Sequence, residues 1–213
     1  MPETIARVDT GVCEGDTITP FYDPMIAKII VHGATRESAL NKLTAALSDC
    51  HVAGTITNAE FLHALSRDED FARGDVDTGL IARKQSELTT QATPSAVVRA
   101  LAGLAALDLV WRRDGASPWD RLADWRLWRS AQKGVTLHYH GARIDMVIVA
   151  HGYGHFDVTD GESVLPLQIA PLDERSVRVV SDGYAFTAKL VPAGHALHVF
   201  MHGSNFVFEV ADD

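Results

Sequence analysis

The stretch from Thr93 to Trp111, TPSAVVRALAGLAALDLVW, constrains the fold more than any other part of this chain. Pro94 suits the first position of a helix because that position needs no backbone N–H donor, and Thr93 can cap it. From Ala100 to Leu107 every residue is Ala, Leu or Gly. A helix that is apolar on all sides must be enclosed by protein or by lipid. We therefore expect an enclosed helix over residues 94–111.

Enclosure by lipid is the weaker alternative. Arg99 and Asp108 interrupt the stretch, which is rich in Ala, whereas a membrane span needs about 20 strongly apolar residues. The formal net charge of −9 also disfavours nucleic acid or an anionic membrane as the main partner, because both require basic patches. The sequence therefore predicts a globular protein with no membrane and no nucleic-acid partner.

The cysteines and the N-terminus indicate the compartment. Cys13 and Cys50 are isolated, with no CxxC or Cys/His spacing, and two such thiols fit a reducing environment. The first four residues, Met-Pro-Glu-Thr, lack the apolar core of a signal peptide. We expect a bacterial-like cytoplasm or another reducing compartment.

From Val135 onward, apolar and polar residues alternate with a period of two, which is typical of half-buried strands. Turn dipeptides separate several of the predicted strands: His140-Gly141, Asp160-Gly161, Asp182-Gly183, Ala193-Gly194 and His202-Gly203. The eight predicted strands are 135–140, 144–151, 154–159, 163–169, 175–181, 184–191, 195–201 and 205–210. This pattern predicts an antiparallel barrel or sandwich, and a barrel around helix 94–111 would explain why that helix is apolar on all sides.

The first 88 residues have a different, mixed α/β pattern. Short strands are predicted at residues 6–9 and 25–32, and the continuous run Ile26, Ile29, Ile30, Val31 indicates a strand covered on both faces. Helices are predicted from 36 to 49 after a Thr35 cap, after Asn58 and after Thr78. So few strands look like part of a sheet rather than a whole one.

The residues alone contain no complete catalytic site. The sequence has no GxxxxGK[ST] or GxGxxG phosphate loop and no GxSxG elbow. His138 and His140 lie two apart on a predicted strand and would share a face, but no zinc spacing such as HExxH is present, so no metal site is predicted. All four tryptophans fall between residues 111 and 128. They either plug an opening in the fold or form a contact surface.

Motifs in the first 88 residues resemble the C-terminal subdomain of biotin carboxylase. They are Arg7–Val12, Glu14–Asp16, Tyr22–Lys28, Gly54, Thr57-Asn58, Phe61-Leu62 and Asp77–Gly79. The Ala/Leu helix, Ser117–Trp119, Trp125–Leu127 and the eight strands then resemble the bridging domain of acyl-CoA carboxylase α subunits. Within this family the chain is most similar to α subunits that act on 3-methylcrotonyl-CoA; α subunits for propionyl-CoA or geranyl-CoA are alternatives.

The resemblance implies an α+β fold in two parts. Residues 1–88 would be the C-terminal piece of an ATP-grasp biotin carboxylase domain, and residues 89–213 the bridging domain. The latter divides into the helix at 94–111, a connection at 112–133 and an eight-stranded antiparallel barrel at 134–211. A ligand-binding barrel or a non-catalytic adaptor is the alternative of another class.

The resemblance also implies cofactors and partners. The parent enzyme would use ATP, Mg²⁺ and bicarbonate to carboxylate biotin, and a carboxyltransferase β subunit would transfer the carboxyl group to the acyl-CoA. The remaining partners would be the ATP-grasp and biotinyl carrier domains of the α subunit. The sequence contains neither the ATP-grasp motifs nor the Met-Lys pair of the carrier domain. We therefore expect this chain alone to be inactive and to bind none of these cofactors.

Three site residues follow from the resemblance. Asp23 would lie near the biotin-binding end of the active site, Thr78 at the edge of the adenine pocket, and Arg7 at the dimer interface of free-standing bacterial biotin carboxylases. Local chemistry offers alternatives, because Asp23 precedes Pro24 in a predicted turn and Thr78 is a good helix cap. The docking surface for the β subunit is predicted at Trp119, Trp125 and Trp128.

Overall fold

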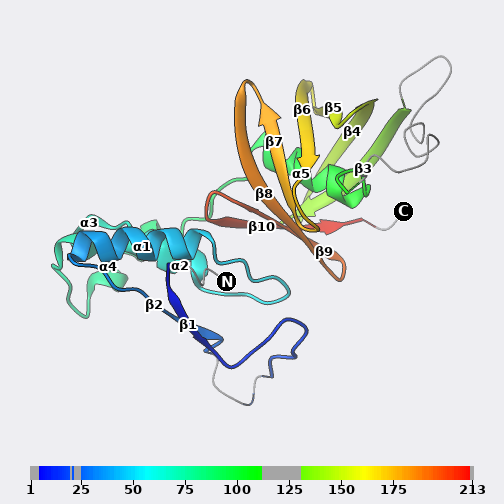
Figure 1. The fold of residues 1–213 in the computed structure, drawn as a ribbon. Helices are drawn as coiled ribbons and strands as arrows, with labels where there is room; N and C mark the ends of the chain where they lie inside the picture. The colour runs from blue at the N-terminus through cyan, green and yellow to red at the C-terminus, as the bar shows by residue number, and fades with distance from the viewer. Residues whose placement is uncertain (1–4, 20, 22–24, 112–130, 212–213) are drawn as a thin grey trace. The chain divides into compact units, whose positions relative to one another are not determined.

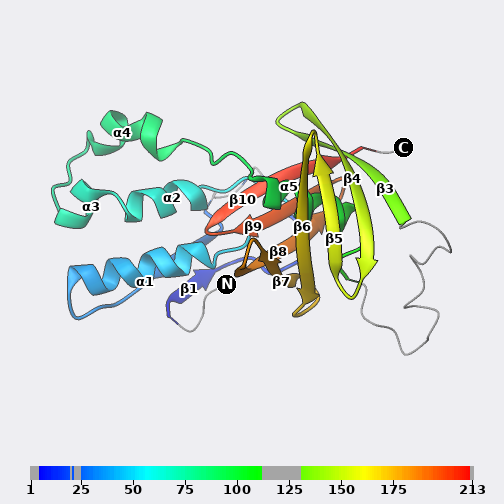
Figure 2. The same ribbon diagram turned by 90° about the horizontal axis from the view of Figure 1, so that it is seen from above.

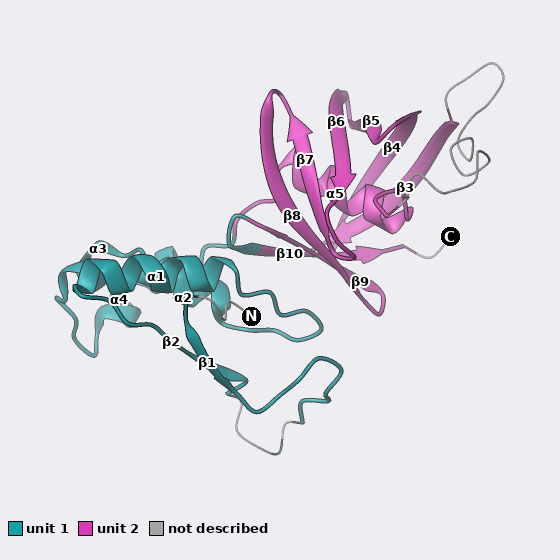
Figure 3. Cartoon of the chain, in the orientation of Figure 1, with its two compact units in different colours: residues 1–91, 202–204 teal, residues 92–201, 205–213 magenta. Residues whose placement is uncertain are grey.

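The computed structural model describes residues 5–19, 21, 25–111 and 131–211. These form two compact units, one of residues 1–91 with 202–204 and one of residues 92–201 with 205–213 (Figure 3). Each unit has its own secondary structure and is described separately.

The first unit combines a two-stranded sheet with four helices. Strand β1 (Arg7–Thr10) pairs with β2 (Ala27–Ile30) in antiparallel register, with Arg7 opposite Ile30 and Thr10 opposite Ala27. The helices are α1 (Arg36–Ser48), α2 (Ala59–Ser66), α3 (Glu69–Arg73) and α4 (Leu80–Leu88) (Figure 1). Helix α1 contacts α2, α3 and β2. The two strands thus pack on one side of a small helical layer.

Side-chain caps explain where two of these helices, α1 and α3, begin. The Thr35 hydroxyl accepts the backbone N–H of Ser38, as predicted for the start of α1. Asn58 precedes α2 as predicted, but its side chain makes no capping hydrogen bond. Helix α3 was not predicted, because five residues are too few to show a helical period. Asp68 caps it by accepting the N–H groups of Asp70 and Phe71.

Strand β2 differs from the prediction of a strand covered on both faces. Lys28 and Ile30 are exposed, and 38% of Ile30 is accessible, while Ala27 and Ile29 are half-buried. The continuous apolar run therefore belongs to a strand with one solvent-facing side in this unit.

The second unit is a closed antiparallel barrel, and all eight predicted strands are confirmed (Figures 1 and 2). Each strand pairs with its neighbour in sequence, and β10 closes the barrel against β3. The strands are β3 (Ala131–Tyr139), β4 (Ala142–Gly152), β5 (His155–Asp160), β6 (Ser163–Pro171), β7 (Ser176–Ser181), β8 (Tyr184–Ala193), β9 (Ala196–Met201) and β10 (Ser204–Val210).

Left-handed residues make the hairpin turns between these strands. His140-Gly141, Tyr153-Gly154, Asp182-Gly183 and His202-Gly203 have positive φ at both positions, which defines type I′ turns. At Gly161 and Gly194 only the glycine has positive φ, as in type II′ turns. The Tyr153-Gly154 turn differs from the prediction, which places Gly154 in a strand.

Helix α5 (Ala96–Ala106) is the apolar helix predicted for the interior. Ser95 caps it by accepting the N–H of Val98, so the helix begins two residues after Pro94. It also ends five residues before the predicted Trp111. Asp108 adopts φ 56°, and the N–H of Leu109 donates to the Leu104 carbonyl over 2.9 Å. This is a Schellman motif, which terminates a helix.

The barrel encloses α5, as predicted from its all-round apolar surface. The helix contacts β3, β4, β5, β6 and β9, which lie on different sides of the barrel. Val98, Leu101 and Leu104 have no accessible surface and join the inward-facing side chains of the strands in one core. Leu107, at the end of the helix, is only partly buried against this core.

Candidate functional site

The first unit contains an apolar cavity of about 740 Å³. Strand β2 and helices α1 and α2 provide most of its wall, and Phe71 of α3 also lines it. Its lining comprises Met25, Ile26, Ala27, Lys28, Ile29, Leu43, Leu47, Cys50, Val52, Ile56, Thr57, Asn58, Ala59, Leu62, Leu65, Ser66 and Phe71. Met25 and Ile26 directly follow the Tyr-Asp-Pro stretch at 22–24. A wall of this composition suits apolar groups rather than proton transfer.

Cys50 is the most reactive side-chain type in this wall, but its environment suppresses the thiolate. Burial raises the pKa of the Cys50 thiol above its ordinary value. Because the thiolate is the nucleophilic form, Cys50 is poorly suited to attack a substrate at neutral pH. The cavity therefore has no activated cysteine.

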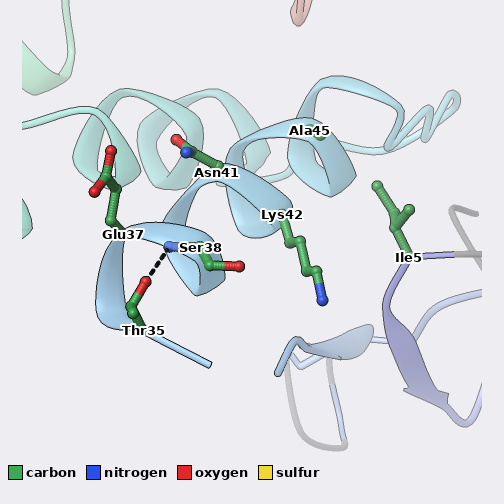
Figure 4. Close-up of a pocket in the computed structure, with 7 residues that line it drawn as sticks. All are labelled: Ile5, Thr35, Glu37, Ser38, Asn41, Lys42 and Ala45. Atoms are coloured by element: carbon green, nitrogen blue, oxygen red, sulfur yellow. Dashed lines mark hydrogen bonds between the residues drawn. The ribbon is translucent and has the colours of Figure 1, made fainter. Parts of the chain in front are cut away.

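A second, shallower hollow of about 460 Å³ runs along the exposed side of α1 (Figure 4). In Figure 4 the side chains of Lys42 and Ile5 extend toward the same space from opposite walls. The Lys42 ammonium donates to the His32 carbonyl over 2.8 Å. The other residues that line this hollow are Thr35, Glu37, Ser38, Asn41 and Ala45. Thr35 is already used as the helix cap, so this hollow is a surface groove with a structural lysine.

Ser48 and His63 form a pair that no sequence motif predicts. The Ser48 hydroxyl lies 3.0 Å from His63 Nε2, and burial, with a further contribution from Arg67, lowers the His63 pKa. A neutral histidine beside a hydroxyl is half of a nucleophile–base arrangement. A parallel bond of 2.9 Å joins Thr44 to Ser66. Both bonds connect α1 to α2, and we interpret them as helix–helix contacts whose partners are too far apart in sequence to form a motif.

Arg7 lies on β1 with 74% of its side chain exposed. Its Nε lies 2.8 Å from Asp9 Oδ1 on the same strand, and this hydrogen bond lowers the Asp9 pKa. Within the described ranges, no hydrogen bond or ion pair joins Arg7 to Thr78. The described residues therefore show no polar contact between these two predicted site residues.

Thr78 is exposed in the turn before α4. The alternative prediction that it caps this helix is wrong, because the N-cap position is Gly79. The Asp77 carboxylate organises the turn instead, accepting the Gly79 N–H over 2.8 Å and pairing with Arg83 Nη1 over 2.9 Å. This leaves the Thr78 hydroxyl outside the capping network.

The other predicted site residues, Asp23, Trp119, Trp125 and Trp128, lie outside the described residues. Among the residues that the structure does describe, no three His, Cys, Asp or Glu side chains converge as metal ligands would. His140 lies in the β3–β4 turn with φ 49°, so it does not share a strand face with His138 as predicted. In the described part of the chain, no helix has the length and hydropathy needed to cross a membrane.

Comparison with known proteins gives the two units a common context. Residues 2–83 match the model of the biotin carboxylase C-terminal domain. The mitochondrial methylcrotonoyl-CoA carboxylase subunit alpha of Dictyostelium discoideum is 30% identical over 100% of this chain and 33% of its own length. Urea amidolyase of Saccharomyces cerevisiae is 45% identical over 39% of this chain and 5% of its own length.

A solved single-chain, multi-domain long-chain acyl-CoA carboxylase aligns with 99% of this chain and 17% of its own, at 22% identity and a TM-score of 0.38. The chain spans about a third of the length of the Dictyostelium relative, and the match covers the whole of this chain. That match runs through the helical unit and then the barrel unit. Residues 2–83 are thus a biotin carboxylase C-terminal domain, and the chain as a whole is homologous to methylcrotonoyl-CoA carboxylase α subunits.

Proposed function

We propose that this chain works as part of the α subunit of a biotin-dependent acyl-CoA carboxylase whose substrate is 3-methylcrotonyl-CoA. The observation that carries the proposal is the match to one methylcrotonoyl-CoA carboxylase α subunit through both units in the same order. The biotin carboxylase domain alone is less specific, because urea amidolyase shares a similar segment.

In this proposal residues 1–88 complete a wall of the biotin carboxylase site. The parent enzyme uses ATP, Mg²⁺ and bicarbonate to carboxylate biotin, with Asp23 near the biotin end and Thr78 at the adenine edge. The exposure of Thr78 in the turn before α4 is compatible with contact to another part of the parent protein. Arg7, also exposed, is available for a contact between carboxylase domains.

Residues 89–213 form the domain that docks onto the carboxyltransferase β subunit. Helix α5 occupies the barrel interior, and four of its residues, Val98, Leu101, Ala102 and Leu104, have no accessible surface. An eight-stranded barrel holds either packed side chains or one small ligand, so a barrel filled by a helix is poorly suited to ligand binding. Its function then belongs to its outer surface. We propose that Trp119, Trp125 and Trp128 contribute the contact, since tryptophan is enriched among residues that dominate binding energy.

The test is binding of the full chain to the carboxyltransferase subunit of the same organism, measured by titration. Trp119→Ala and Trp125→Ala should each weaken binding about tenfold or more. Tyr184→Ala, which removes an exposed aromatic ring of the barrel, is the control and should bind as the wild type does. Unchanged affinity in both tryptophan variants would remove them from the docking surface, and no binding by the wild type would contradict the docking role.

A non-catalytic adaptor is the competing function, and Asp23 distinguishes the two. In the complete α subunit, Asp23→Ala should lower the rate of biotin carboxylation, whereas an adaptor segment would be indifferent to this change. The 213-residue chain by itself should show no bicarbonate-dependent ATP hydrolysis, because its sequence has no glycine-rich phosphate loop. Measurable hydrolysis by the purified chain would contradict this expectation.

A further inference from the structure

The turn between β4 and β5 presents an aromatic side chain on an unfavourable backbone. Gly152, Tyr153 and Gly154 have consecutive φ values of 85°, 52° and 75°. Tyr153 is 85% exposed, so burial does not explain its presence. Gly, Asn, Asp and His are the residue types enriched in this left-handed region, and a bulky aromatic residue there is an outlier.

Equivalent turns in the same barrel follow the usual preference. The first position of the type I′ turn is His140 between β3 and β4, and Asp182 between β7 and β8. Only at Tyr153, among the described type I′ turns, does a residue outside the favoured types take this position. A sequence optimised for folding alone has better choices, since Asn-Gly is strongly preferred in such turns.

The surrounding structure holds this turn in place. The Ile169 N–H donates to the Gly154 carbonyl over 2.8 Å, which fastens the turn to β6. A Cβ atom at Gly154 would lie 2.1 Å from the Ile169 carbonyl oxygen, so the two backbones pack directly against each other. The register of β4 and β5 also shifts between Ala150 and Gly152, and such bulges redirect a strand and its side chains. Tyr153 is therefore displayed on a fixed support.

A second exposed apolar side chain lies on the same rim of the barrel. Leu172, with 57% of its surface exposed, follows the end of β6, and β6 runs antiparallel to β5. The end of β6 and the start of β5 consequently meet at this rim. Ala131, the first residue of β3, pairs with Ala150 near the same rim.

We propose that Tyr153 is an anchor by which this rim docks onto the carboxyltransferase subunit, with Leu172 extending the apolar contact. The proposal rests on the docking role proposed above. A tyrosine offers a large ring and a hydroxyl group with few rotatable bonds, which suits a pocket with an apolar wall and a polar end. Because the turn is already fixed, binding does not have to order it, and that raises affinity.

Tyr153→Asn separates an anchor from a structural residue. Asn relieves the left-handed strain, so thermal unfolding of the full chain should shift to a higher Tm. Affinity for the carboxyltransferase subunit of the same organism should nevertheless fall about tenfold or more, because the ring is lost. A folding role alone cannot produce a more stable protein that binds less tightly.

Two matched variants control this experiment. His140→Asn places asparagine at the equivalent turn position on the opposite rim, and Tyr184→Ser removes a tyrosine that is 78% exposed there. Both should bind as the wild type does. If the wild type binds and Tyr153→Asn binds equally well, or binds less only because its Tm has fallen, the anchor is refuted while the docking role stands. If the wild type does not bind at all, both are refuted.

Discussion

Arg99 and Asp160 form the ion pair that connects the enclosed helix to the wall of the barrel. Arg99 Nε lies 2.5 Å from Asp160 Oδ2 at the end of β5, and Arg99 Nη1 donates to the Pro94 carbonyl over 2.7 Å. Only 28% and 24% of the two side chains are exposed. The single charged residue of α5 therefore has a partner at the point where the helix meets the rim.

Removing the acid of this pair should destabilise the barrel. Asp160→Ala leaves the half-buried Arg99 without its carboxylate, and we expect the free energy of unfolding to fall by about 1–2 kcal/mol. Asp145→Ala is the matched control, because Asp145 pairs with Arg143 on the surface with 60% and 66% of the side chains exposed. It should cost about 0.5 kcal/mol or less. Urea denaturation measures both, and equal losses would contradict the structural role of the Arg99–Asp160 pair.

Gly103 should tolerate a methyl group but not a larger side chain. A Cβ atom there would lie 2.8 Å from Met146 Cε, 3.1 Å from Val135 Cγ1 and 3.4 Å from Ile148 Cδ1. In Gly103→Ala, the gain in helix propensity offsets the displacement of the flexible Met146 end, so stability should change by less than about 1 kcal/mol. Gly103→Leu should destabilise by about 3 kcal/mol, because it overfills the barrel. If Gly103→Leu were as stable in urea as Gly103→Ala, the barrel would pack around α5 less tightly than the structure indicates.

Replacing Asp108 with glycine should make the barrel unit more stable. Asp108 occupies the left-handed position of the Schellman motif that ends α5. The two residues joined by the hydrogen bond of this motif, Leu104 and Leu109, are both buried. Asp108→Gly removes the Cβ strain and should raise stability by about 0.5 kcal/mol. Ala106→Gly, in the last helical position of α5, should instead lower it by about 0.5–1 kcal/mol. Thermal unfolding of both variants checks the opposite signs.

The barrel and its helix could be predicted because their signals are local. Alternating residues mark the strands, and X-Gly dipeptides mark most of the turns between them. The run from Ala100 to Leu107 has no polar side chain and must therefore be enclosed. The end of the helix could not be predicted in the same way. Leu109 and Val110 continue the apolar pattern, and the left-handed conformation of Asp108 is visible only in the backbone.

The candidate site of the first unit was harder to predict, because its parts are distant in sequence or lack a distinctive residue type. Ser48 and His63 come together through the packing of α1 on α2, and no spacing rule announces such a contact. Threonine is common at N-cap positions, which predicts Thr78 as the cap of α4. In the structure the neighbouring Asp77 carboxylate accepts the Gly79 N–H instead. Tertiary structure decides between equally good local candidates.

The contacts of Lys84 should make the first unit sensitive to acid. Its ammonium lies 2.6 Å from Asp68 and 2.6 Å from Asp70, and its hydrogen bonds lower the pKa of both carboxyl groups. A lowered folded-state pKa gives stability that is present above the unfolded value near 4 and is lost as the pH falls through the folded value. Helical circular dichroism in urea at pH 7 and pH 3 should show this loss. Lys84→Met should reduce the pH dependence, whereas Lys42→Met should retain it.

Gly154 should be the least replaceable glycine among the type I′ turns of the barrel. Its φ of 75° strains any residue with a Cβ, and that atom would also lie 2.1 Å from the Ile169 carbonyl oxygen. Gly141 has a similar φ of 78°, but no atom lies within 4 Å of the place that a Cβ would take there. Gly141→Ala should therefore cost about 1 kcal/mol from backbone strain, and Gly154→Ala about 3 kcal/mol because the steric clash adds to it. Urea denaturation of the two alanine variants gives the difference directly. Equal losses would mean that the turn carrying Tyr153 is not packed against β6, and the support proposed for the anchor would then be absent.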